Sequence, residues 1–176
     1  MNDIDVRYPI GRFDFKAPFR SEDRPSCFDQ LADGPAKLDA AIAGLFDQQL
    51  DTAYRPEGWT VRQVVHHLAD AQVNWYIRVK LAVTEAQPRI VPYAEQLWAE
   101  LADARLGPVE PSLKMFGGVT ERWCRLLESL KPEDWSRSFS HPEWGPITVE
   151  DTLRLMAWHT RHHTAHITEL RKRMSW

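Results

Sequence analysis

The sequence TVRQVVHHL at positions 60–68 combines a helix start, an apolar stripe and two adjacent histidines. Thr60 is a favoured N-cap residue, and Gln63, three positions later, completes a capping box. Apolar residues then recur at intervals typical of one helix face, namely Val61, Val64, Val65, Leu68, Trp75, Tyr76 and Val79. We therefore expect a long amphipathic helix from Thr60 to about Val83, with Pro88 preventing its continuation.

Three further segments carry helical patterns. Residues 112–130 keep the apolar spacing of bundle helices. Thr148 opens a second capping box, and the helix that it starts should reach about Met174. Residues 25–50 hold the first apolar stripe, but Pro35 removes a backbone donor and predicts two pieces or a bend.

The connections between these helices are long and irregular. A short helix over 93–104 fits between prolines, and a turn or small hairpin is expected near 141–146. Residues 1–20 show no helical stripe, so we expect an arm whose aromatic side chains pack on the body. With no convincing strand run, the pattern predicts an all-α fold: a four-helix bundle with long irregular connections and an N-terminal arm.

Composition narrows the class of protein. A length of 176 residues predicts one domain spanning 1–176, and 43% hydrophobic residues exclude a disordered chain. The chain has 22 basic and 25 acidic residues, so it has no excess of positive charge to neutralise phosphates, and we expect no nucleic-acid partner. The longest apolar run is far shorter than the roughly 20 residues that cross a bilayer, so we expect no membrane partner. Two cysteines and no signal-peptide pattern indicate the cytoplasm.

Four of the seven histidines lie between positions 159 and 166. Two pairs are spaced four apart, so each pair shares a helix face: His159 with His163, and His162 with His166. The first pair falls within about 60–70° of the apolar direction, at about 100° per residue, whereas the second lies toward a flank. Inward imidazoles need polar partners, and one divalent metal would satisfy both. We therefore expect His159 and His163 to be metal ligands.

The helix from Thr60 is the obvious source of a third ligand, but periodicity does not separate His66 from His67. Three histidines leave a coordination position open, which is typical of catalytic rather than structural metal sites. Asp70, one turn beyond, is either a group that orients a ligand or a surface carboxylate. His141 lies in a polar loop, where we expect an ordinary surface residue.

The motif GWTVRQVVHHLAD at 58–70 resembles a signature of the DinB-like superfamily, and within it the YfiT-type metal-dependent hydrolases. Further matches to the same group spread over nearly the whole chain: YPIG at 8–11, PAKL at 35–38, QLDT at 49–52 and HTAHITEL at 163–170. Together these motifs are specific to that family.

The resemblance implies a four-helix bundle that holds one divalent metal per chain, Zn²⁺ or Ni²⁺, through three histidines. The second histidine of the doublet is a ligand in that family, which corresponds to His67, and the other two correspond to His159 and His163. Relatives often carry more histidines in the last helix, where this chain has Thr160 and Arg161. The family is also associated with homodimers and, in some members, with transfer of a low-molecular-weight thiol such as bacillithiol.

The function expected from these observations is that of a metal-dependent hydrolase in which the metal activates water toward a small-molecule substrate. A metal-dependent thiol S-transferase of the bacillithiol type is an alternative, since a coordinated thiol is also deprotonated at neutral pH. A third alternative is a non-catalytic protein that binds a metal or a small molecule. The sequence names no general base and does not separate hydrolysis from thiol transfer.

Overall fold

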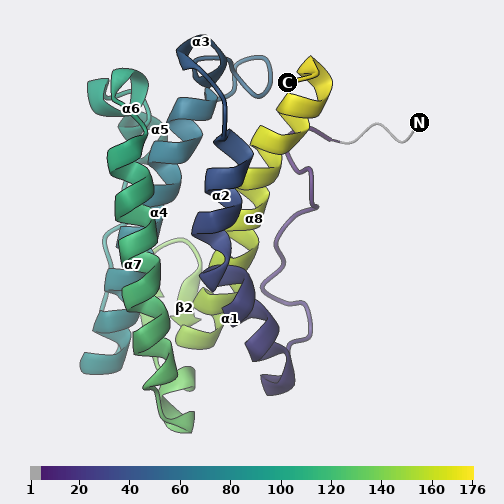
Figure 1. The fold of residues 1–176 in the computed structure, drawn as a ribbon. Helices are drawn as coiled ribbons and strands as arrows, with labels where there is room; N and C mark the ends of the chain where they lie inside the picture. The colour runs from purple at the N-terminus through teal and green to yellow at the C-terminus, as the bar shows by residue number, and fades with distance from the viewer. Residues whose placement is uncertain (1–4) are drawn as a thin grey trace.

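A computed structural model describes residues 5–176, most of which form helices (Figure 1). The main elements are α1 (Arg24–Ala32), α2 (Gly34–Ile42), α4 (Val61–Thr84), α7 (Glu110–Glu128) and α8 (Val149–Met174). Helix α4 packs on α7 and α8. The consecutive helices α1 and α2 together take the place of the fourth helix of the bundle and pack on α8 and α7. The all-α, four-helix-bundle prediction is confirmed; residues 1–4 of the expected arm lie outside the described residues.

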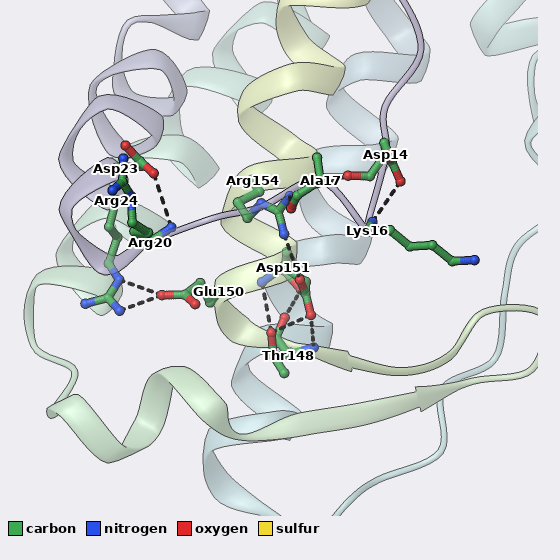
Figure 2. Close-up of polar contacts among 11 residues, drawn as sticks. Asp14, Lys16, Ala17, Arg20, Asp23, Arg24, Thr148, Glu150, Asp151 and Arg154 are labelled. Carbon is green, nitrogen blue, oxygen red and sulfur yellow. Dashed lines mark hydrogen bonds and ion pairs between the residues drawn. The ribbon is translucent and has the colours of Figure 1, made fainter.

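Both predicted capping boxes are formed. The amide of Gln63 donates to Thr60 Oγ1 at 3.2 Å, and the amide of Thr60 donates to Gln63 Oε1 at 2.9 Å. At the start of α8 the amide of Asp151 donates to Thr148 Oγ1 at 2.9 Å, a contact visible in Figure 2. Each box satisfies amides that the first helical turn would otherwise leave without partners.

The first helical region is divided more than the sequence indicates. Asp33 separates α1 from α2, where the bend was expected, but α2 ends at Ile42 and Gly44 turns the chain with φ 77°. A four-residue helix, α3 (Asp47–Leu50), follows. Helix α2 passes very close to α8, since a Cβ placed on Gly34 would lie 2.9 Å from the Thr160 methyl carbon.

The long connections contain short elements. Instead of one helix over 93–104 there are two, α5 (Glu95–Trp98) and α6 (Ala102–Leu106). The turns η1 (Ser21–Asp23) and η2 (Pro132–Ser136) precede α1 and the hairpin, respectively. The expected hairpin is present as antiparallel strands β1 (Ser138–His141) and β2 (Gly145–Thr148), which lead directly into α8.

The apolar core runs along the bundle between the long helices. Fully buried side chains come from every long element, among them Leu31, Leu38, Leu68, Phe116, Trp123, Leu153 and Ile167. The hairpin adds Phe139 and Ile147, both also buried. Burial of this apolar surface is the main driving force that holds α4 and α8 side by side.

The described part of the arm, residues 5–20, runs beside α8 (Figure 1). Arg154 of α8 donates hydrogen bonds to the backbone oxygen of Ala17 at 3.0 Å and to that of Asp14 at 3.4 Å (Figure 2). The Phe13 ring packs against Trp158 with centroids 5.7 Å apart. The arm therefore packs on the body, as its aromatic residues indicate.

None of the described helices is both long enough and apolar enough to cross a bilayer.

Replacing the α8 cap, Thr148→Ala, should lower the free energy of unfolding by about 1 kcal/mol, because the Asp151 amide loses its partner. Urea denaturation followed by circular dichroism measures this change. Thr84→Ala is the matched control, since that hydroxyl lies at the exposed end of α4 and donates to Lys80 O. Equal losses in the two variants would contradict the assignment of Thr148 as the cap that stabilises α8.

Candidate metal centre

Helix α4 directs its two adjacent histidines toward different neighbours. His66 Nδ1 lies 2.7 Å from Ser112 Oγ of α7, and its Nε2 lies 3.3 Å from the Gly107 carbonyl oxygen. His67 faces α8 instead, with its Nε2 3.2 Å from His159 Nε2. The structure thus separates the two members of the doublet, which periodicity alone could not do.

His163 lies one turn beyond His159 and completes a three-histidine cluster. Its ring centroid is 4.5 Å from that of His159 and 4.7 Å from that of His67. One ligand nitrogen from each of the three residues lies within 4.8 Å of the others. The structure therefore brings His67, His159 and His163 together from two helices.

The three imidazoles are neutral at pH 7. Burial, with a smaller contribution from the nearby His162 and His166, lowers the pKa of His67 to about 4. Burial also lowers the pKa values of His159 and His163 well below the ordinary value. A neutral imidazole keeps a nitrogen lone pair, which is the form that binds metals.

The cluster fits a divalent cation. Zinc–imidazole bonds of about 2.0–2.1 Å in a tetrahedral site place two ligand nitrogens about 3.3 Å apart. The nitrogens of His67 and His159 are 3.2 Å apart. Apart from this contact, neither ring nitrogen of His159 and neither of His163 makes a hydrogen bond within residues 5–176, so the protein does not saturate these two imidazoles.

A second group of histidines, His162, His163 and His166, also has ligand nitrogens within 4.8 Å. It comes from one helix and shares His163 with the first group. The His162 ring stacks on Trp158 with centroids 4.4 Å apart, and His166 stacks on Tyr54 at 4.0 Å. His162 and His166 are 6% and 2% exposed, which is more buried than the half-buried His159 and His163. The expected difference between an inward and a flank pair therefore does not hold, because aromatic rings and the arm cover His162 and His166.

The first cluster borders a cavity of about 900 Å³. The arm forms one wall, and the backbone oxygen of Arg7 lies 3.2 Å from His166 Nε2. Trp59 lies over His67 with ring centroids 4.6 Å apart. Other walls come from α4, α8, the hairpin and the segment 92–96. The size and the aromatic lining are those of a small-molecule site.

His141 is not the surface residue that its polar loop indicates. It is 5% exposed, lines the cavity and stacks on Trp144 with centroids 4.4 Å apart. Its Nδ1 accepts the amide hydrogen of Glu143 at 3.2 Å. The prediction was wrong because backbone hydrogen bonds of Ser140 with Pro88 and Ile90 hold β1 against a distant segment of the chain. The composition of the loop does not reveal that contact.

Asp70 and the two cysteines stand apart from the cluster. Asp70 is half-buried, burial raises its pKa to about 6, and its carboxylate makes no hydrogen bond to His67 in the described structure. Burial raises the pKa values of Cys27 and Cys124, the latter to about 11, so both are protonated thiols at pH 7. None of the three is placed to take part in chemistry at the cluster.

One cavity residue that the sequence analysis missed is Arg78. Its guanidinium lies over the Trp75 ring, 4.5 Å from the centroid. The signal was the spacing: eleven residues separate Arg78 from His67, which is close to three helical turns and therefore the same face. Trp144 and the arm were missed as cavity walls because loops carry no periodic pattern.

Known proteins share this arrangement of helices and much of the sequence. The profile of the DinB superfamily matches residues 30–167. A Bacillus cereus protein named "Putative metal-dependent hydrolase" is 51% identical over 172 residues, which is 98% of this chain and 99% of that protein. A Bacillus thuringiensis subsp. konkukian protein of the same description shows the same identity and coverage.

A solved structure agrees with these relatives. YfiT from Bacillus subtilis, described as "a probable metal-dependent hydrolase with an unusual four-helix bundle topology", superposes with a TM-score of 0.94 at 44% identity. The match covers 98% of this chain and 99% of that one. The chain, as its sequence motifs predict, belongs to the DinB superfamily.

Proposed function

We propose that the protein is a metal-dependent hydrolase whose divalent metal is held by His67, His159 and His163. The observation that carries the proposal is the meeting of three neutral imidazoles, from two helices, within 4.8 Å at the edge of a cavity. The names of the relatives and the description of YfiT support the same class of activity.

Imidazole ligands suit Zn²⁺ and Ni²⁺, the two metals that we propose. When bound, such a cation supplies Lewis acidity and lowers the pKa of water, to about 7 in zinc enzymes. The chain contributes three uncharged donors, so the ligands leave the positive charge of the ion undiminished. Three protein ligands also leave coordination positions for water and substrate.

The cavity determines what can reach this centre. A volume of about 900 Å³ accommodates a small molecule, and supports a small-molecule substrate over a folded protein. Trp59 covers the cluster on one side and the arm closes another, so both restrict the access of bulk water. In a less hydrated site the electrostatic effect of a cation on a polarised bond is stronger.

Removing any ligand should empty the site. His67→Ala, His159→Ala and His163→Ala are each expected to lose most of the bound metal, because two imidazoles hold a divalent ion far more weakly than three. Elemental analysis of protein purified without an affinity tag measures the metal content.

His66→Ala is the matched control, since His66 faces Ser112 and Gly107 and should keep its metal. Loss of metal in His66→Ala together with retention in His67→Ala would show that the ligand assignment is wrong.

The metal should stay bound at pH values well below about 6.5, the ordinary pKa of histidine. Because burial lowers the pKa of His67 to about 4, protons compete with the metal only as the pH approaches that value. The free energy of unfolding should also fall with pH. Below about pH 6.5 the unfolded chain binds protons at this histidine whereas the folded chain does not, so the folded state loses stability as the pH falls toward 4.

Dialysis over a pH series, with metal analysis and circular dichroism on each sample, measures release and unfolding separately. Release of half of the metal near pH 6.5 from folded protein would contradict this prediction.

Activity distinguishes hydrolysis from the alternatives. Metal-loaded protein should hydrolyse activated esters such as 4-nitrophenyl acetate without added thiol, and His163→Ala should lose this turnover, measured by nitrophenol release. Turnover that requires a low-molecular-weight thiol would instead identify a thiol transferase. Bound metal with no turnover under either condition would identify a binding protein.

A further inference from the structure

Arg78 is a buried charge without a partner. The residue is only 5% exposed, yet its guanidinium makes no hydrogen bond and no ion pair with any of residues 5–176. Its guanidinium lies over the face of Trp75, and the carboxylate of Glu95, which lines the same cavity, acts on it only from beyond ion-pair distance. Because burial disfavours the charged form, the pKa of Arg78 lies below its ordinary value. Buried charges in proteins are normally paired, so an unpaired arginine at a cavity is a candidate binding site for an anionic ligand.

Another arginine of the same helix shows the usual arrangement. Arg62 is also 5% exposed, but it donates to Asp51 at 2.6 Å, to Asp47 at 2.9 Å and to the Gly107 carbonyl oxygen at 3.0 Å. Its guanidinium is saturated by the protein itself. Arg78 has the same burial and borders the cavity, but no carboxylate of the described chain lies within ion-pair distance of it.

A flat aromatic wall adjoins Arg78. The Trp144 ring stacks on His141 with centroids 4.4 Å apart and planes 13° apart, and it is parallel to Trp75 at 6.1 Å within the same 13°. Trp144 is 48% exposed, so one end of this wall is open to solvent. Such a surface fits a planar apolar group, and the adjacent guanidinium fits an anionic one.

This region and the three-histidine cluster border the same cavity. Arg78 and His67 lie on one face of α4 with about 16 Å between their Cα atoms, from a rise of about 1.5 Å per residue. Side chains on a helix lean toward its N-terminus, so the Arg78 side chain extends toward His67. A single molecule can therefore reach both ends of the cavity.

We infer that Arg78 binds the anionic group, a carboxylate or a phosphate, of a small substrate whose planar apolar part lies against the exposed ring of Trp144. The reacting end of that substrate then extends toward the histidine cluster. The statement about the reacting end rests on the proposed function, whereas binding of the anion by Arg78 needs no metal.

The test uses the full-length protein freed of metal, so that a carboxylate cannot bind through a cation. Benzoate, phenyl phosphate and the uncharged benzyl alcohol are titrated against intrinsic tryptophan fluorescence. At least one anion should bind about tenfold or more tightly than benzyl alcohol, the expected effect of a charge-assisted hydrogen bond. The tighter of the two anions then identifies the preferred group.

Arg78→Gln should weaken that anion by about tenfold or more and leave benzyl alcohol unaffected. Arg12→Gln is the matched control, because Arg12 borders the same cavity from an exposed position on the arm and should change binding by only about twofold. Unchanged affinity in Arg78→Gln, or an equal loss in Arg12→Gln, would overturn the inference.

A second measurement covers the case in which Arg78→Gln does not fold. In ¹⁵N-labelled wild-type protein the Arg78 Nε–H resonance should shift with the anion and not with benzyl alcohol, and an unshifted resonance would overturn the inference. Failure of the proposed function gives a different result: anion binding persists in the metal-free protein while hydrolysis shows no dependence on metal.

Discussion

The structure depends on the burial of three imidazole rings, from two helices, at one point. Burial keeps His67, His159 and His163 uncharged, and the same burial is what makes them suitable donors for a cation. It also carries a cost, since Nδ1 of His159 and of His163 has no hydrogen-bond partner in the described part of the chain. The apolar contacts between the long helices must hold α4 and α8 together against this cost.

The two capping boxes fix the residues at which these helices begin. Thr60 lies seven residues before His67, close to two turns, and Thr148 lies eleven residues before His159, close to three. Each histidine therefore shares a face with the cap that starts its helix. The hairpin fixes where α8 begins, because β2 ends at Thr148 itself. Local hydrogen bonds thus fix the start of each helix, and its buried apolar face orients the imidazoles several turns away.

Much of this arrangement could be predicted because it follows from sequence patterns that span only a few residues. Caps, apolar spacing and the four-residue interval between His159 and His163 are local, and the structure agrees with all of them. The choice between His66 and His67 required the family resemblance, because it depends on which helix lies on which side of α4. The burial of His141 depends on segments far away in sequence, so no local pattern indicates it. Arg78, by contrast, shares the helix face of His67 through its eleven-residue spacing, a local signal that the sequence analysis did not use.

The close crossing of α2 and α8 links the outside of the bundle to its interior. Gly34 leaves just enough room for Thr160, whose backbone follows directly after that of His159. A methyl group at position 34 would meet the Thr160 methyl carbon at 2.9 Å, so the Thr160 side chain or α8 itself would have to shift. Position 34 is therefore sensitive to substitution through its packing on the helix that carries His159, although no atom of Gly34 borders the cavity.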